Sequence, residues 1–265
     1  MSKTILITGS TDGIGLATAK TLVQQGHTVL IHGRSEKKLD AVKIQLLKLT
    51  SEPKIETYKA DLSVLSEVEA LASAVSERQK PLDVLINNAG VFVVPETVSV
   101  DGLDVRFVVN TIAPYLLTKR LLPVLGDSGR VVNLSSAAQA SINPGELAKP
   151  SMLDDGTVYA KSKLAITMWT KYLADKLGNH GPVIIAVNPA SFLGSKMVKQ
   201  AYGRQGGDLQ RGADALVKAA LSDEFSAASG LYFDNDIGQF AQPHPDGLDT
   251  KKVTEIASQI ERVMA

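Results

Sequence analysis

The feature that most constrains this chain is a glycine-rich turn, Thr8–Gly15, between an apolar run and an amphipathic run. The preceding run, Thr4–Thr8, is rich in β-branched residues and has the length of a buried strand. The following run, Leu16–Gln25, has apolar residues at helical spacing, and Gly26 is a residue type that commonly ends a helix. A strand-to-helix turn directs free backbone N–H groups and the positive helix end at one point, which favours a bound phosphate.

The three glycines of this turn have separate physical roles. Gly9 permits the tight turn, Gly13 lets a pyrophosphate approach the backbone, and Gly15 lets the helix pack closely on the strand. The alternative is a connection that binds nothing, but the flanking strand and helix are the context that a phosphate motif requires. The residues of the turn predicted to contact the ligand are Gly9, Ser10, Thr11, Gly13, Ile14 and Gly15.

Composition excludes several function classes. Lys+Arg and Asp+Glu both count 28, so no basic excess indicates binding to nucleic acid or to an anionic membrane. The absence of cysteine excludes disulfides and cysteine nucleophiles. The four histidines show no ligand spacing, so we expect no metal site. The first strand begins three residues after Met1 and no apolar run reaches membrane-spanning length, so we expect no signal peptide, no membrane span and a cytoplasmic protein.

Strands and helices alternate along all 265 residues, which predicts a single α/β domain over 1–265. We expect a Rossmann-type, doubly wound parallel sheet of about seven strands with helices on both faces. The strands are expected at Thr4–Thr8, Thr28–His32, Ile55–Tyr58, Val84–Ile86, Arg130–Leu134, Val183–Val187 and Leu231–Phe233. The helices are expected at Leu16–Gln25, Glu36–Leu49, Leu65–Ser76, Leu103–Leu125 (bent or interrupted at Pro114), Tyr159–Leu177, Asp208–Leu221 and Thr250–Val263.

The end of the second strand indicates which dinucleotide would bind. An NAD site usually has a carboxylate about 20 residues after the glycine turn, which accepts hydrogen bonds from the ribose. Here that position is Gly33, followed by Arg34, whose guanidinium suits a 2′-phosphate. NADP(H) is therefore predicted over NAD(H), with the hydroxyls of Ser10 and Thr11 as further ligands of the same phosphate. A solvated surface arginine is the alternative.

A tyrosine and a lysine, Tyr159 and Lys163, lie four residues apart and so share one face of a predicted helix. A free phenol has a pKa of about 10 and is a poor base at neutral pH. A neighbouring ammonium and a bound cationic nicotinamide would both favour the phenolate. Because such a pair also arises by chance on helices, its meaning depends on polar residues at the ends of other strands, where open α/β sheets bind ligands.

The polar residues at the predicted strand ends, together with the glycine turn, Tyr159 and Lys163, occur in an order that resembles the short-chain dehydrogenase/reductase family. The resemblance covers roughly residues 3 to 198. The resemblance implies an NAD(P)-dependent oxidoreductase in which Ser136, three places after Asn133, is catalytic with Tyr159 and Lys163. It implies that Asn110 holds a water in a proton relay, although a structural amide is the alternative. It also implies cofactor contacts from Asp61 and Leu62 at the adenine and from Asn88, Ala89 and Gly90 in the cleft; Asp61 alone would suggest only a helix N-cap.

Two segments depart from the compact family pattern. Where relatives have Pro-Gly and a nearby threonine that contacts the nicotinamide carboxamide, this chain has Pro189-Ala190 and Ser195. Pro189 and Ser195 are still expected to contact the cofactor, while Ala190 puts the backbone path in question. The segment between Ser136 and Tyr159 is longer than in compact members, which makes the chain similar to the retinol-dehydrogenase-like branch.

The predicted function is hydride transfer between nicotinamide and a carbonyl or alcohol carbon of a neutral, mainly apolar small molecule. A substrate loop is expected at about 189–212, and Gln139–Thr157 could form the opposite rim of the pocket. The apolar residues expected near substrate are Phe92, Val93, Val94, Phe192, Leu193, Met197, Val198 and Tyr202, unless they only pack on the domain. A homodimer or homotetramer through the helices at Leu103–Leu125 and Tyr159–Leu177 is expected. A non-catalytic NADPH sensor or scaffold is the alternative, whereas a serine hydrolase would need a Gly-x-Ser-x-Gly elbow that is missing.

Overall fold

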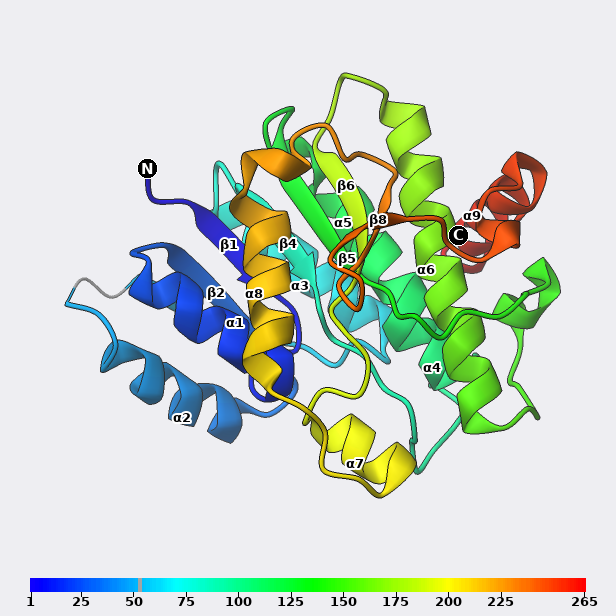
Figure 1. Cartoon of the computed structure of the whole chain (residues 1–265), viewed down its shortest axis with the longest axis horizontal. Helices are drawn as coiled ribbons and strands as arrows, with labels where there is room; N and C mark the ends of the chain where they lie inside the picture. The colour runs from blue at the N-terminus through cyan, green and yellow to red at the C-terminus, as the bar shows by residue number, and fades with distance from the viewer. Residues whose placement is uncertain (52–53) are drawn as a thin grey trace.

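The computed structural model describes residues 1–51 and 54–265, and within them eight strands form one sheet in the order β3-β2-β1-β4-β5-β6-β7-β8 (Figure 1). Seven strands are parallel, as the alternation of strands and helices predicts. The strands are β1 (Thr4–Ile7), β2 (Thr28–Gly33), β3 (Ile55–Lys59), β4 (Val84–Asn87), β5 (Arg130–Leu134), β6 (Val183–Asn188), β7 (Tyr232–Asp234) and β8 (Gln239–Ala241).

The expected count of about seven strands is close to the observed sheet, which has one further strand, β8. It has only three residues and pairs antiparallel with β7 at the sheet edge. A run this short has too few positions for a period-two pattern, so no strand could be predicted there. Strands β7 and β8 form a hairpin whose turn includes Gly238 at a φ of 69°.

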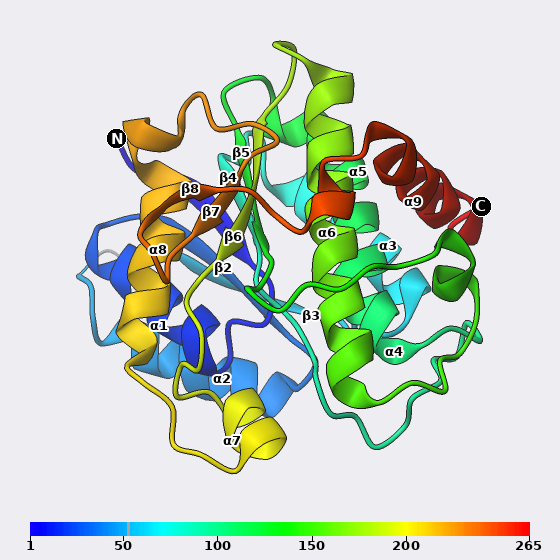
Figure 2. The same cartoon turned by 45° about the vertical axis from the view of Figure 1, so that its right-hand side comes forward.

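Helices cover both faces of the sheet, as Figure 2 shows. One apolar core lies between the sheet and α1, α2 and α8, with Ile5, Leu22 and Leu216 as members, and the other lies under α3, α5, α6 and α9. The helices are α1 (Gly13–Gln24), α2 (Glu36–Leu47), α3 (Leu65–Arg78), α4 (Val105–Phe107), α5 (Ala113–Leu125), α6 (Asp155–Leu177), α7 (Lys196–Tyr202), α8 (Leu209–Leu221) and α9 (Thr250–Val263).

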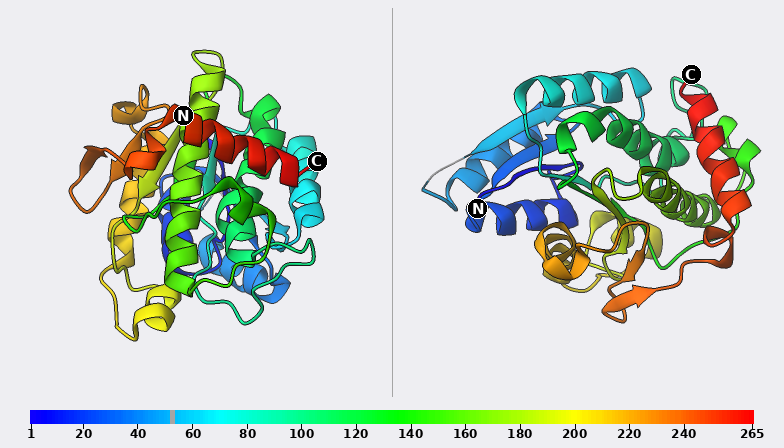
Figure 3. Two further views of the ribbon diagram at one scale, coloured as in Figure 1. Left: turned by 90° about the vertical axis from the view of Figure 1, so that its right-hand side faces the viewer. Right: turned by 90° about the horizontal axis from the view of Figure 1, so that it is seen from above.

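The closing helix α9 packs across the outer side of α6 (Figure 3). Its Val253, Ile256 and Ile260 are buried in the same core as Trp169 of α6. The hydroxyl of Tyr115, on α5, donates a 2.7 Å hydrogen bond to Glu261 at the far end of α9. The chain thus covers part of the outer surface of the two long helices with its own C-terminal helix.

The expected helix Leu103–Leu125 departs from α-helical geometry ahead of Pro114 rather than at it. The structure has α4, then a π-helical segment Val108–Ile112, then α5, with Pro114 in the first turn of α5. The helical backbone runs without a break from Val105, since the Ala113 N–H still donates to the Val108 carbonyl, and Pro114 lies just after the π-helical segment. The extra residue of the π-helical segment displaces the helix register around Asn110, and such segments are frequent at functional sites.

Candidate active site

The glycine turn has the shape that a close approach of backbone to ligand requires. Gly9 and Gly13 have φ of 65° and 56°, where residues with a Cβ are strained. A Cβ on Gly15 would lie 2.4 Å from the Asn88 amide nitrogen, so only glycine lets α1 approach β4. Asp12 caps α1 by accepting the Gly13 N–H, and the N–H groups of the next residues lie in the first helical turn, which offers them no acceptor. The turn therefore fits a pyrophosphate.

Thr8 and Asn88 fix this turn to β4. The Thr8 hydroxyl is buried and accepts the N–H groups of Asn88 and Ala89 at 3.0 and 3.1 Å. The Asn88 amide donates to the carbonyls of Thr8 and Gly9. Sequence reasoning named Asn88 but missed Thr8, whose place directly before Gly9 was the available signal.

His32, a second residue that sequence reasoning missed, fixes the turn to β2. Its Nδ1 accepts the Gly9 N–H at 3.1 Å, so the proton resides on Nε2, which faces the Ala60 carbonyl at 3.1 Å. Burial lowers the pKa of His32 to about 4, so the ring is neutral. The Ser10 hydroxyl is buried and bonded to the main chain of His32. The Ser10 oxygen is thus enclosed and holds β2, and the contact of Ser10 with the 2′-phosphate stays a prediction.

Arg34 and Asp61 lie together where the adenosine half of a dinucleotide would be held. The Arg34 guanidinium is 3.9 Å from the Asp61 carboxylate, and its side chain is 75% exposed. Asp61 is not a helix N-cap, since α3 is capped at Val64; its carboxylate accepts instead from the N–H and hydroxyl of Ser63. Leu62 is buried in the core, which limits how much of the adenine it can cover.

Gly33, at the carboxylate position of an NAD site, lies directly against Thr11. A Cβ on Gly33 would be 2.7 Å from the Thr11 methyl carbon, closer than real Cβ contacts. Thr11 is only half-buried, so its hydroxyl stays accessible at this edge of the cleft. The pair leaves no room for a carboxylate unless Thr11 moves.

Ser136 and Tyr159 meet at the carboxyl end of β5. The Ser136 hydroxyl lies within hydrogen-bonding reach of the Tyr159 hydroxyl. The neighbouring Ser135 hydroxyl is buried and bonded to the Lys163 carbonyl and the Thr167 hydroxyl of α6, at 3.1 and 2.6 Å. Of the two serines, Ser136 has the geometry for contact with a reacting oxygen.

The charges of Tyr159 and Lys163 differ from the expectation of a ready phenolate. Burial raises the pKa of Tyr159 to about 12, an effect that the hydrogen bond to Ser136 only partly offsets. Burial also lowers the pKa of Lys163 to about 8. Desolvation therefore favours the phenol form of Tyr159 over the phenolate.

Asn110, on the π-helical segment, lies near Lys163, since both side chains border Gly90. Its side chain exchanges two hydrogen bonds with the main chain of Val91, at 2.8 and 2.9 Å, and donates one to the Ser162 hydroxyl at 3.0 Å. These contacts tie the loop after β4 to α6. A Cβ on Gly90 would lie 3.4 Å from the Asn110 oxygen and 3.6 Å from the Lys163 ammonium, so Gly90 borders both groups.

The loop after β6 follows a glycine-type path even though it lacks the glycine. Ala190 has a φ of 132° and Phe192 a φ of 52°, conformations that L-residues rarely adopt. The hairpin of β7 and β8 holds this path, because Asn235 donates to the Pro189 carbonyl and Asp236 accepts from the N–H and hydroxyl of Ser191. The hairpin thus holds Ala190 in a backbone conformation that is typical of glycine.

Ser195 begins α7, a helix that sequence reasoning assigned to an irregular loop. Its hydroxyl accepts the N–H of Val198, so its oxygen serves as the N-cap of α7. A Cβ on Gly13 would lie 3.9 Å from the Cβ of Ser195, so the loop after β6 lies over the glycine turn. Lys196 forms an ion pair with Asp12, so α7 is tied to the cap of α1.

A row of aromatic rings in pairwise contact, which we call the aromatic file, extends from the protein surface to Tyr159. The Phe92 ring centre is 4.7 Å from that of Tyr159 and 5.8 Å from that of Tyr202. Tyr202 in turn packs against Phe192, whose side chain is 56% exposed. The Met197 methyl reaches Gly90, while Leu193 is buried against Gly212 and Ile14 and anchors the loop.

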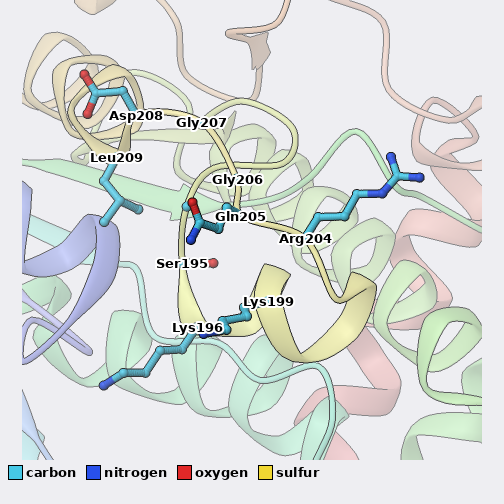
Figure 4. A pocket seen from close by; sticks show the side chains of 10 residues that line it. Ser195, Lys196, Lys199, Arg204, Gln205, Gly206, Gly207, Asp208 and Leu209 are labelled. Carbon is cyan, nitrogen blue, oxygen red and sulfur yellow. The ribbon is translucent and has the colours of Figure 1, made fainter.

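The outer side of this loop borders a cavity of about 480 Å³ (Figure 4). Lys196, Lys199 and Arg204 contribute cations, and Figure 4 shows Lys196 and Arg204 extending in opposite directions. The three are exposed, as expected, and form no clamp for a carboxylate. Within residues 1–51 and 54–265, no group of His, Asp and Glu is arranged to hold a metal ion. Across the same described residues, no helix has both the length and the hydropathy needed to cross a membrane.

Comparisons with known proteins show what this chain is similar to. The family model for short chain dehydrogenase matches residues 3–205. Human polyprenol dehydrogenase is 32% identical over 251 residues, covering 87% of this chain and 76% of the relative, and human retinol dehydrogenase 11 is 31% identical over 243 residues with the same coverage. A short-chain dehydrogenase TIC 32 B from Brassica napus, described as chloroplastic, is 31% identical over 87% of this chain and 79% of its own.

Solved structures share the fold over most of the chain. An uncharacterised protein from Mycobacterium paratuberculosis has a TM-score of 0.80 and 27% identity, covering 99% of this chain and 93% of the other. A Burkholderia cenocepacia J2315 short chain dehydrogenase, solved in complex with NADP, has a TM-score of 0.69 and 27% identity, covering 88% and 95%. The chain therefore belongs to the short-chain dehydrogenase family, is similar in sequence to its retinol-dehydrogenase-like branch, and is an NAD(P)-dependent oxidoreductase.

Proposed function

We propose that this protein uses NADP(H) in preference to NAD(H) to interconvert a neutral, mainly apolar carbonyl compound and its alcohol. The observation that carries the proposal is the Tyr159 hydroxyl, placed against Ser136 and beside Lys163 at the end of the aromatic file. The turn Gly9–Gly15, together with Asn88, Ala89 and Gly90, would hold the dinucleotide along the strand ends. Arg34 and Thr11 would hold its 2′-phosphate, Asp61 and Leu62 its adenine, and Pro189 and Ser195 the nicotinamide end.

The chain's own groups have distinct tasks in this chemistry. When bound, the nicotinamide supplies hydride for reduction or accepts it for oxidation. Ser136 donates a hydrogen bond to the reacting oxygen, and Tyr159 gives that oxygen a proton during reduction. Lys163 holds the cofactor ribose and stabilises the phenolate that is left, and Asn110 keeps a water on the route by which the proton is replaced.

An apolar substrate is supported by what lines the approach to Tyr159. Phe92, Tyr202 and Met197 present aromatic and thioether surface, and no arginine pair stands among them. The names of the polyprenol and retinol relatives point to the same chemistry. The cluster is a substrate wall built from two loops, the one after β4 and the one carrying α7.

The test is a panel of aldehydes, ketones and alcohols, with NADPH absorbance as the readout for wild type and Tyr159→Phe. We expect turnover of neutral apolar compounds in wild type alone. The double variant Phe192→Ala, Met197→Ala should raise KM for these compounds without changing NADPH affinity. The control is Leu231→Ala, at an exposed apolar residue directly before β7, which should change neither KM nor NADPH affinity. Charged sugar phosphates turning over far better than every neutral carbonyl would contradict the substrate class. NADPH binding without turnover of any compound would favour the sensor.

Assembly and compartment remain predictions of the sequence. A homodimer or homotetramer is still expected, but α9 covers part of α5 and α6, so a partner must bind to another surface or to the uncovered part of these helices. Light scattering gives the mass that decides this. The cytoplasm remains the proposed compartment, which imaging of a tagged protein in its source cells would check.

A further inference from the structure

The chain around Ser136 leaves the sheet at the point where catalysis would need it to be fixed. The last β5–β6 hydrogen bond runs from the Ser135 N–H to the Val187 carbonyl at 2.9 Å, and the Ser135 side chain is bound to α6. Beyond Ser136, Ala137 and Ala138 are exposed. Strand pairing therefore ends one residue before the serine whose hydroxyl faces Tyr159.

Two side chains from other parts of the chain hold the carbonyl of Ser136. The Tyr232 hydroxyl donates to it at 3.1 Å from β7, two strands away, and the Gln139 amide donates to it at 3.0 Å. Tyr232 pairs in register with Ala186 of β6, and this small neighbour leaves space for the phenol ring to reach β5. A carbonyl with two donors has both of its lone pairs engaged, which fixes the peptide plane that follows Ser136.

The two donors are themselves held. Gln139 also accepts the N–H of His244 at 2.9 Å and contacts the Tyr232 hydroxyl, so the segment between β8 and α9 supports it. Burial raises the pKa of Tyr232 well above that of a free phenol, which keeps its hydroxyl a donor at any physiological pH. Both side chains also line a cavity of about 230 Å³, together with Ala137 and His244, so they border open space as well as the core.

We propose that Tyr232 and Gln139 are positioning residues for the proposed reaction, acting through the carbonyl of Ser136 to keep its hydroxyl on the reacting oxygen. Among the described residues, neither side chain hydrogen-bonds to the turn Gly9–Gly15 or to a residue proposed to bind the dinucleotide. This inference rests on the proposed role of Ser136. It predicts a loss in turnover with unchanged cofactor affinity.

The experiment is a double-mutant cycle on the full chain, with kcat, KM for an aromatic aldehyde and NADPH Kd as readouts. Tyr232→Phe should lower kcat by about 3- to 20-fold, the effect of one hydrogen bond, and leave NADPH Kd within about twofold. In a Ser136→Ala background the same change should cost less than about twofold, since residues acting through one group are not additive. Tyr172→Phe, which removes a phenol hydroxyl on α6 that meets only Lys176 among the described residues, is the matched control.

The outcomes separate the two proposals. Loss of turnover in Ser136→Ala together with wild-type kcat in Tyr232→Phe would overturn the positioning role alone, as would an equal loss from Tyr232→Phe in both backgrounds. Wild-type turnover in Ser136→Ala would overturn the role of Ser136 and the inference with it. If Tyr232→Phe does not fold, as judged by near-UV circular dichroism, Gln139→Met removes the second donor with similar volume and the same criteria apply.

Discussion

The ammonium nitrogen of Lys163 lies 5.6 Å from the centre of the Tyr159 ring and donates a 2.7 Å hydrogen bond to the Leu134 carbonyl. The lysine is thus fixed by the end of β5, not by the tyrosine that it would assist. Its Nζ borders Gly90 and faces the space beside the ring. With the pKa of Tyr159 raised to about 12 and that of Lys163 lowered to about 8, both by burial, the site holds a proton donor at neutral pH.

The two reaction directions should therefore differ in pH dependence. Reduction uses the phenol, the dominant form below about pH 12, so kcat for reduction should be flat from pH 6 to 7.5 and fall as Lys163 loses its proton near pH 8. Oxidation uses the phenolate, whose fraction increases with pH, so its rate should rise between pH 7 and 9. Stopped-flow pH profiles with saturating cofactor measure both. An oxidation rate independent of pH over that range would contradict a raised tyrosine pKa.

Catalytic substitutions should separate proton transfer from cofactor binding. Tyr159→Phe removes the proton donor and keeps the ring, so turnover should fall by at least about 100-fold while NADPH still binds. Lys163→Met should lower both turnover and NADPH affinity, because one ammonium serves both. Ser136→Ala should reduce turnover more than Ser135→Ala does, since the Ser135 hydroxyl is bonded to α6. A larger loss from Ser135→Ala would place the catalytic serine one residue earlier.

Cofactor choice should depend on Arg34. Its pairing with Asp61 at 3.9 Å is exposed and weak, so the guanidinium is free to bind a phosphate. Arg34→Ala should weaken NADPH by about 10- to 100-fold and NADH by much less. Fluorescence titration of both cofactors measures this, with Arg120→Ala, an exposed arginine on α5, as the control. Equal losses for the two cofactors would remove the 2′-phosphate role.

A carboxylate at Gly33 tests the same edge of the cleft from the opposite direction. Gly33→Asp should repel a 2′-phosphate and favour NADH, but its Cβ meets the Thr11 methyl. We expect the single variant to bind both cofactors poorly. Thr11→Ser removes that methyl, so the double variant should recover NADH binding. No recovery would show that the close contact at Gly33 is not what limits NADH.

The buried His32 should make the free energy of unfolding depend on pH. Its folded-state pKa of about 4 lies below its ordinary value of 6.5, so the unfolded chain binds more protons between these values. Its contribution to the free energy of unfolding is full above pH 6.5 and declines as the pH falls toward 4, by about 3 kcal/mol. Urea unfolding at pH 7 and 4.5 should show a smaller pH-dependent loss for His32→Asn than for wild type. The exposed His180→Asn should behave as wild type does.

How far the sequence specified the fold depends on the length of each signal. Thr250–Val263 has the predicted bounds because its buried residues recur at helical spacing, and Arg130–Leu134 has them because it is a continuous, mainly apolar run with the length of a buried strand. The three-residue β8 and the seven-residue α7 were missed, since neither contains a full pattern. The π-helical segment at Val108–Ile112 was missed because it differs from an α-helix by one inserted residue and not by composition.

Some site residues could be predicted from the sequence, and others could not. Glycines and the Tyr159–Lys163 pair occur at spacings that sequence alone displays. The partners that hold them do not, because His32, Tyr232 and Gln139 come from distant strands and loops and only the folded chain brings them together. Desolvation also depends on the fold, so the raised pKa of Tyr159 could not be inferred from its neighbour Lys163.

The strained backbone at Ala190 gives a final prediction. A φ of 132° costs a residue with a Cβ about 1–3 kcal/mol, and it persists because Asn235 and Asp236 hold the residues on either side. Ala190→Gly removes that strain and adds about 0.5–1 kcal/mol of unfolded-state entropy cost, so the variant should be more stable by about 1 kcal/mol. Ala17→Gly, in α1 with ordinary helical geometry, should instead lose about 1 kcal/mol. Thermal unfolding of the two variants measures the contrast. Equal destabilisation by Ala190→Gly and Ala17→Gly would mean that the backbone at Ala190 is not strained. The contacts with the β7–β8 hairpin would then not be holding the loop after β6 in a strained conformation.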